Sequence, residues 1–102
     1  MAYKLRYLPI FEEDLLNTVK YISRELNNPS AANRLLDDVE QAILERSENP
    51  LSFEPYRSGK HRQETYYRIY VRNYVVFYVV IGDVMEVRRL IYGGRDIDRH
   101  LS

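Results

Sequence analysis

The stretch that decides the fold is residues 66–96, YYRIYVRNYVVFYVVIGDVMEVRRLIYGGRD. It contains three strand-like runs. Tyr66–Arg72 alternates apolar and polar side chains, Tyr74–Ile81 is apolar throughout, and Val84–Tyr92 follows a Gly-Asp turn. An unbroken apolar run is typical of a strand covered on both faces, so the second run is expected in the middle of a three-stranded antiparallel meander.

The first half of the chain predicts one strand and two helices. Residues 3–8 alternate as a short strand, and Pro9 suits the first position of a helix that runs to the Asn-Asn-Pro sequence at 27–29. A second helix then begins with Asn28 as its N-cap and stops at Asn49. The connection is so short that the two helices should form an antiparallel hairpin.

These elements predict a single α+β domain over residues 1–102, in which the helix hairpin covers one face of the sheet. Residues 50–64 are rich in turn residues and predict a polar loop. No other element remains to cover the second sheet face, so we expect that face to be open and to display arginine and tyrosine.

Composition excludes several classes of protein. The chain has no cysteine, which removes disulfides, thiolate metal sites and cysteine nucleophiles and fits a reducing cytoplasm. No metal-ligand spacing or nucleotide-binding fingerprint is present, so neither a metal nor a cofactor is expected. The longest strand-like apolar run has eight residues, far short of the roughly 18 that cross a bilayer, and no signal peptide is visible.

Charge is balanced overall but divided between the halves. Residues 1–50 carry six basic and nine acidic side chains, and residues 51–102 carry nine basic and six acidic ones. A neutral domain can therefore present a basic face, although single surface arginines are more often merely solvated. The candidate partner-binding residues on this face are Arg68, Tyr70, Arg72, Arg88, Arg89 and Arg95.

Three segments, taken together, resemble the RelE/ParE superfamily of toxins from type II toxin–antitoxin systems. They are YLPIFEEDLLNTVKYISRELNNPSAANRLLDDVEQAI at residues 7–43, YYRIYVRNYVVFYVV at 66–80 and VRRLIYGGRDIDRHL at 87–101. The first is similar to the helix hairpin of ParE-type toxins, and the other two are similar to the strands and the Arg-Asp tail of the superfamily.

The resemblance implies a cytoplasmic toxin that inhibits bacterial growth and stabilises plasmids. It also implies a cognate antitoxin whose amphipathic C-terminal segment binds the toxin, in an assembly such as a toxin–antitoxin heterotetramer. ParE-like members poison DNA gyrase and cut nothing, whereas RelE-like members are ribosome-dependent endoribonucleases that cut mRNA. Whether the chain is an enzyme therefore depends on the branch, and an inactive interaction domain of the same fold is a further alternative.

Comparison with the RelE-like cleavage pattern leaves an incomplete catalytic set. Arg68 and Arg95 match basic positions of that pattern, and Tyr70 stands where a second basic residue is usual. Tyr92, His61 or Glu64 would have to replace the missing groups. Val75 stands where an arginine is usual, and Leu101 stands where many such nucleases have a tyrosine. These departures favour the ParE-like branch. In either branch Arg95 is the residue expected to matter most, because it is the one basic position that matches both. A loop histidine such as His61 is more often idle than catalytic.

Overall fold

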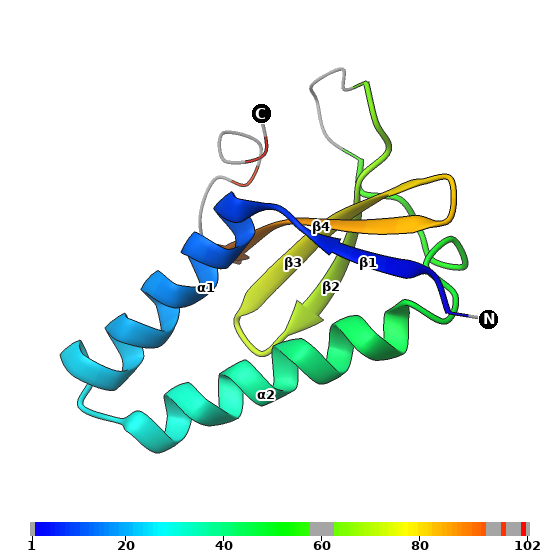
Figure 1. The fold of residues 1–102 in the computed structure, drawn as a ribbon. Helices are drawn as coiled ribbons and strands as arrows, with labels where there is room; N and C mark the ends of the chain where they lie inside the picture. The colour runs from blue at the N-terminus through cyan, green and yellow to red at the C-terminus, as the bar shows by residue number, and fades with distance from the viewer. Residues whose placement is uncertain (1, 58–62, 94–96, 98–100, 102) are drawn as a thin grey trace.

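The computed structural model describes residues 2–57, 63–93, 97 and 101. Its α+β architecture is the predicted one: a helix hairpin packs against one face of a four-stranded sheet (Figure 1). In the part of the chain that is described, no helix is long and apolar enough to cross a bilayer.

The sheet contains β1 (Lys4–Tyr7), β2 (Tyr67–Val71), β3 (Tyr74–Ile81) and β4 (Val84–Tyr92). The strand order is β1-β4-β3-β2, so the predicted meander of β2, β3 and β4 is confirmed. β1 lies parallel to β4 at the outer edge, with Lys4 opposite Val84 and Tyr7 opposite Val87. Parallel neighbours need a crossover, and the helix hairpin together with β2 and β3 supplies it.

The hairpin consists of α1 (Pro9–Lys20), one π-helical turn (Tyr21–Glu25) and α2 (Pro29–Arg46). Asn28 caps α2 as predicted, because its side-chain oxygen accepts a hydrogen bond from the Ala31 N–H at 3.1 Å. Asn27 adopts a positive φ of 50°, which turns the chain between the helices. In Figure 1 the helices meet at this turn and diverge toward the sheet.

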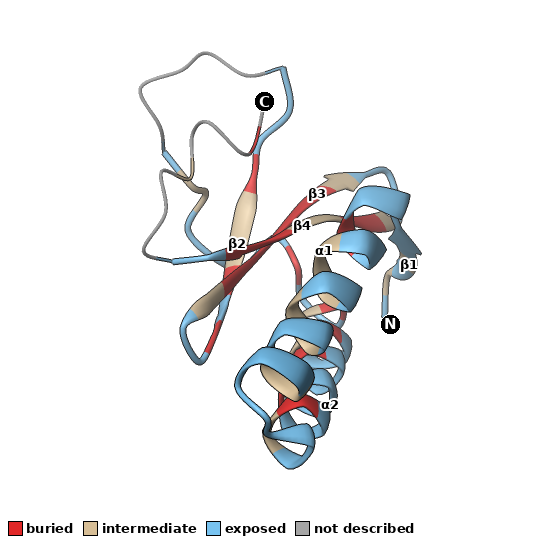
Figure 2. Ribbon diagram, turned by 90° about the vertical axis from the view of Figure 1, so that its left-hand side faces the viewer, coloured by how far each residue is buried: buried red, intermediate tan, exposed pale blue. Residues whose placement is uncertain are grey.

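The main core lies between the hairpin and the sheet, where Figure 2 shows buried residues on both. Phe11 of α1 and the helical stripe of α2 pack there against alternate residues of the strands. Its buried members are Phe11, Leu35, Val39, Ile43, Ile69, Val71, Val76, Tyr78, Met85, Val87 and Leu90.

The second sheet face is also covered, and the expectation of an open face was wrong. A second cluster contains Tyr66, Val75, Phe77, Val79, Ile91 and Leu101, with Tyr56 and Ile97 packed against it. The loop after α2 reaches the sheet because the Tyr56 N–H donates a 2.7 Å hydrogen bond to the Tyr66 carbonyl. Apolar side chains scattered in the loop and tail therefore cover what no regular element covers.

Candidate functional site

An irregularity in β4 arranges the arginines of the sheet. Val87 lies opposite Tyr78, and Arg89 lies opposite Phe77, the neighbouring residue of β3. Arg88 is therefore an extra residue in β4 at this point. Such a β-bulge changes the alternation of side chains along a strand. It returns Leu90 to the main core three residues after Val87, where regular alternation would place it on the other face.

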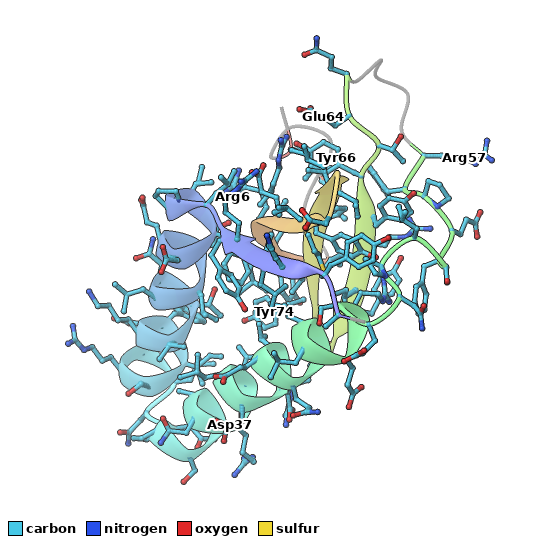
Figure 3. All side chains as sticks on the ribbon, turned by 45° about the vertical axis from the view of Figure 1, so that its right-hand side comes forward. Arg6, Asp37, Arg57, Glu64, Tyr66 and Tyr74 are labelled. Atoms are coloured by element: carbon cyan, nitrogen blue, oxygen red, sulfur yellow. The ribbon has the colours of Figure 1, made fainter. Side chains whose placement is uncertain are left out.

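Arg88 lies in a network of ions on the second face. Its Nε donates to Glu86 at 2.8 Å, and its terminal nitrogens donate to Glu64 at 3.2 Å and to the Tyr66 hydroxyl at 3.1 Å. Arg6 of β1 donates to the other oxygen of Glu86 at 2.7 Å. Figure 3 shows Arg6, Glu64 and Tyr66 above the sheet. The network thus joins β1, β4 and the segment before β2.

The ionisation of this network is set by competing effects. Burial alone would raise the pKa of Glu86, but the hydrogen bonds from Arg6 and Arg88 outweigh it and hold the pKa below its usual value. Burial acts to lower the pKa of Arg88. Its hydrogen bonds with Tyr66, Glu64 and Glu86 outweigh this effect, so the pKa is raised above its usual value. Both groups are therefore charged at neutral pH, and Arg88 is committed to internal partners.

Arg89 is held at the edge of β4 by Asp14 of α1. Its Nε and Nη2 donate to the two oxygens of Asp14 at 2.8 and 3.0 Å, and the Leu90 N–H donates to the same carboxylate at 3.0 Å. The hydrogen bonds that Arg89 donates to Asp14, acting against burial, raise the pKa of Arg89. Asp14 therefore ties α1 to the part of β4 that extends beyond β1.

Arg72 occupies the β2–β3 turn with a positive φ of 56°. Its guanidinium pairs with Asp38 of α2 at 2.7 Å, and both side chains are about half exposed, at 48% and 47%. Three of the predicted binding arginines, Arg72, Arg88 and Arg89, thus have carboxylate partners, contrary to the expected open basic face.

Arg68 is different, because within the described residues its side chain has no carboxylate partner. It lies opposite Phe77 and so stands on the second face. Its guanidinium carbon lies 5.2 Å from the centre of the Tyr56 ring and 5.7 Å from that of Tyr70. Two aromatic rings thus hold the cation in place without neutralising it.

A hollow of about 340 Å³ lies at the end of the sheet beside Tyr70. Val75, Gly93 and Ile97 are among its lining residues, and the Tyr70 side chain is highly exposed at 67%. Tyr92 also contributes to the lining. A Cβ on Gly93 would lie 3.7 Å from the Val75 side chain and 3.3 Å from the Asn73 carbonyl, so a larger residue would encroach on this space.

Arg68 and Tyr92 do not form a joint catalytic arrangement in the described structure. Tyr92 lies opposite Tyr74 and packs against its ring, 5.7 Å between centres. Tyr74 packs on the main core, beneath the sheet in Figure 3, whereas Arg68 lies opposite Phe77 of the second cluster. Of the other predicted catalytic residues, Arg95 and His61 lie outside the described residues. No group of metal-ligating side chains gathers in the described ranges.

Arg46, at the end of α2, is an important residue that the sequence analysis missed. Its Nη1 donates to the Arg68 carbonyl and to the Tyr78 hydroxyl, both at 3.0 Å, and its guanidinium lies 3.5 Å from the centre of the Phe53 ring. The buried Tyr78 hydroxyl donates in turn to the Pro50 carbonyl at 2.7 Å. Arg46 therefore fixes both the loop after α2 and the outer edge of β2.

A second hollow, of about 350 Å³, lies between α1 and α2 and is mostly apolar. Its lining residues are Tyr7, Phe11, Glu12, Leu15, Leu36, Val39, Glu40, Ile43 and Leu44. Leu36 and Leu44 are exposed at 36% and 47%, and Glu12 and Glu40 add negative charge. Burial, with a smaller contribution from Glu40, raises the pKa of Tyr7. We call this hollow the interhelical groove.

Comparisons with known proteins identify the fold and the family. The family model described as ParE toxin of type II toxin-antitoxin system, parDE, matches residues 5–97. A structure described as the chromosomal ParDE TA system from P. aeruginosa has a similar chain, with a TM-score of 0.74, 12% identity and coverage of 89% of this chain and 96% of that one.

The RelB-RelE antitoxin-toxin complex from Methanococcus jannaschii contains a chain with a TM-score of 0.50 and 23% identity, covering 95% of this chain and 99% of that one. Identities this low indicate a shared fold alone. No curated protein matches the sequence.

Proposed function

Since this chain belongs to the ParE family of toxins from type II toxin–antitoxin systems, we propose that it inhibits bacterial growth by binding and poisoning DNA gyrase. The match to the ParE family over residues 5–97 is the observation that carries the proposal. In this role the protein acts in the cytoplasm as a binding protein and cuts no nucleic acid itself.

The geometry of the described residues supports a role without cleavage. Cutting RNA at a phosphate needs cations on the developing negative charge and a group that moves protons. Arg72, Arg88 and Arg89 are committed to carboxylates. Tyr92 lies opposite Tyr74, whereas Arg68 lies opposite Phe77, three residues farther along β3. The RelE-like endoribonuclease remains the alternative to test.

A paired assay distinguishes the two activities. Purified toxin should inhibit supercoiling by gyrase and accumulate cleaved DNA, while mRNA on translating ribosomes stays intact. Codon-specific cuts in ribosome-bound mRNA, with supercoiling unaffected, would replace the proposal with the RelE-like alternative. Expression without growth arrest in a gyrase-sensitive strain would favour an inactive interaction domain.

We further propose that the interhelical groove and the edge of β1 receive the cognate antitoxin. An amphipathic helix of the antitoxin fits an apolar groove of this kind, and basic side chains on its rim would face Glu12 and Glu40. The Lys4 and Leu8 N–H groups donate to Asp83 and Val87 of the β4 side. Leu5 and Tyr7 therefore turn their backbone groups outward, where an extended segment can add to the sheet.

Two leucine variants test this docking surface. Leu44→Arg places a bulky charge in the groove, while Leu26→Arg makes the same change at an exposed position outside it. We expect the first to weaken antitoxin binding at least about tenfold, the loss typical of an interface anchor, and the second to leave it unchanged. Titration calorimetry with the antitoxin's C-terminal segment measures both, and equal losses would contradict the assignment. The stoichiometry of the complex tests the expected heterotetramer.

A further inference from the structure

The two outer strands of the sheet, β1 and β2, differ in how their outward backbone groups are used. Just before β2, the Tyr66 carbonyl already accepts a 2.7 Å hydrogen bond from the Tyr56 N–H, whereas β1 turns the groups of Leu5 and Tyr7 outward. We propose that Arg46 is a specificity-determining residue that closes the β2 edge to strand addition by a second copy of this chain. It thereby leaves β1 to the extended segment of the antitoxin, a consequence that rests on the proposed function.

The β2–β3 hairpin determines which backbone groups of β2 point outward. Its two-residue turn makes Val71 and Tyr74 a hydrogen-bonded pair, and such pairs alternate with non-bonded ones along an antiparallel ladder. Ile69 therefore bonds to β3 as Val71 does, whereas Arg68 and Tyr70 direct their N–H and carbonyl groups away from it. An outer strand with open groups of this kind pairs readily with another chain.

The Arg46 side chain occupies this edge. Its Nη1 donates to the outward carbonyl of Arg68 at 3.0 Å and to the buried Tyr78 hydroxyl at the same distance. The guanidinium also lies 3.5 Å from the centre of the Phe53 ring, which holds it from a further side. An incoming strand would have to displace this anchored group before it could bond to the Arg68 carbonyl.

If it were open, the β2 edge would suit a second copy of itself. An antiparallel pair centred on Ile69 joins the outward groups of Arg68 to those of Tyr70 in the other copy through two hydrogen bonds. The same register sets Arg72 opposite Tyr66 of the other copy. Arginines thus face tyrosines and not one another, which is a favourable combination across strands. Side-chain charge therefore does not protect β2, and a physical block is needed.

The β1 edge is protected against a second copy by charge instead. Lys4 and Arg6 share one face of the strand, and their side chains are 77% and 51% exposed. Pairing β1 with its own copy about Arg6 sets two arginines opposite each other, and pairing about Leu5 sets Arg6 opposite Lys4. Like charges directly opposite destabilise a sheet, and charged edge residues are a usual guard against such pairing. An antitoxin strand with carboxylates at the facing positions meets no such repulsion.

Arg46→Met tests the proposal on purified toxin without antitoxin. Methionine keeps an aliphatic side chain against Phe53 but has no hydrogen-bond donor. Sedimentation velocity at matched concentration should show the wild type as a monomer and Arg46→Met as a species of doubled mass. Arg34→Met is the matched control, because it removes the same charge from an exposed position on α2 and should sediment like the wild type. Circular dichroism establishes that each variant is folded.

Two further variants identify the associating edge. Tyr70→Pro removes an N–H that points away from β3, and proline is tolerated on outer strands. Added to Arg46→Met, it should restore the monomer, whereas a proline would not rescue a chain that associates because it is partly unfolded. Phe53→Ala removes an exposed ring and leaves the donors of Arg46 in place. It should give a weaker dimer, and it keeps the test available if Arg46→Met does not fold.

Four results would overturn the proposal: folded Arg46→Met or Phe53→Ala that sediments like the wild type, equal association of Arg34→Met, a dimer that persists with Tyr70→Pro, or a wild-type dimer that Tyr70→Pro dissociates. Antitoxin binding is measured separately. If Arg46→Met self-associates while the antitoxin segment ignores β1 and the interhelical groove, the closed edge stands and the proposed docking fails. If the antitoxin binds there while folded Arg46→Met stays monomeric, the docking stands and the closed edge fails.

Discussion

Two strands of one sheet carry arginines that look alike in the sequence but have different partners in the fold. On β4, Arg88 pairs with Glu86 of the same strand and with Glu64, and Arg89 pairs with Asp14 of α1. Their side chains are only 18% and 20% exposed. On β2, Arg68 lies between two tyrosine rings and keeps its charge unpaired within the described structure. Arg88 and Arg89 join separate elements of the domain, whereas Arg68 makes no such ion pair among the described residues.

The difference arises from partners that are distant in the chain. Asp14 lies 75 residues before Arg89, and Glu64 lies 24 residues before Arg88. Local sequence therefore gives no sign of which arginine is neutralised. The comparison predicts that substitutions on the β4 side act on stability, while substitutions on the β2 side act on binding.

The largest effect on stability is expected for Asp14→Asn. This change removes the charge facing Arg89 and weakens the contact with the Leu90 N–H, and both side chains are mostly buried, at 15% and 20% exposure. Breaking such a pair costs about 3 kcal/mol, which for a domain of this size lowers the melting temperature by roughly 10–20 °C. Thermal unfolding followed by circular dichroism measures the loss.

Asp37→Asn is the control for that measurement, because Asp37 projects outward from α2 in Figure 3. An exposed change of this kind should stay within about 0.5 kcal/mol of the wild type. Similar losses in the two variants would show that Asp14 acts through general charge effects and not through β4.

A smaller effect is expected for Glu86→Gln, about 2 kcal/mol at neutral pH, because hydrogen bonds between charged groups give way to weaker ones. The pKa of Glu86 is lowered in the fold. Its contribution is therefore fully present above the ordinary glutamate pKa of about 4.3 and is lost as pH falls below it.

Chemical denaturation of Glu86→Gln and wild type across pH 3–7 should show this dependence, which follows from the lowered pKa. The stability difference should be constant above about pH 5 and should shrink in more acidic solution. A difference that grows on acidification would mean that the carboxyl is protonated more easily in the folded state, against the assigned direction.

The regular elements were predictable because each has a local signal. Pro9 and Asn28 mark the helix starts, and the uninterrupted apolar run of β3 marks a strand buried on both faces. The coverage of the second face was not predictable in this way. It depends on Tyr56, Ile97 and Leu101, three separate side chains in segments that carry no periodic pattern.

The site was predictable in residue type but not in pairing. The alternating pattern predicts that Arg68 and Tyr70 share one face of a strand, and both lie on β2. The bulge at Arg88 and the role of Arg46 have no comparable signal, since a bulge depends on registry between strands and Arg46 reads as an ordinary last-turn helix cation.

Arg72→Ala should have a small effect, less than about 1 kcal/mol, because its pair with Asp38 is half exposed. Salt screens exposed charges, so the difference from wild type should disappear in about 1 M sodium chloride. Unfolding in urea at low and high salt measures it. A loss that persists at high salt would place Arg72 with the buried arginines of β4 and blur the contrast between the two strands.

The smallest effect on stability, and the sharpest test of the contrast, is expected for Arg68→Ala. Its guanidinium has no charged partner to leave behind among the described residues, so the free energy of unfolding should change by no more than about 0.5 kcal/mol. Growth arrest on induction in a sensitive strain should nevertheless be lost, because an unpaired cation contributes to an encounter with an anionic target and not to the fold. Arg34→Ala, which removes the same charge from exposed α2, should remain stable and toxic. If Arg68→Ala instead unfolds readily, Arg68 is a structural residue like Arg89; if it is stable and fully toxic, the second sheet face does not meet the target.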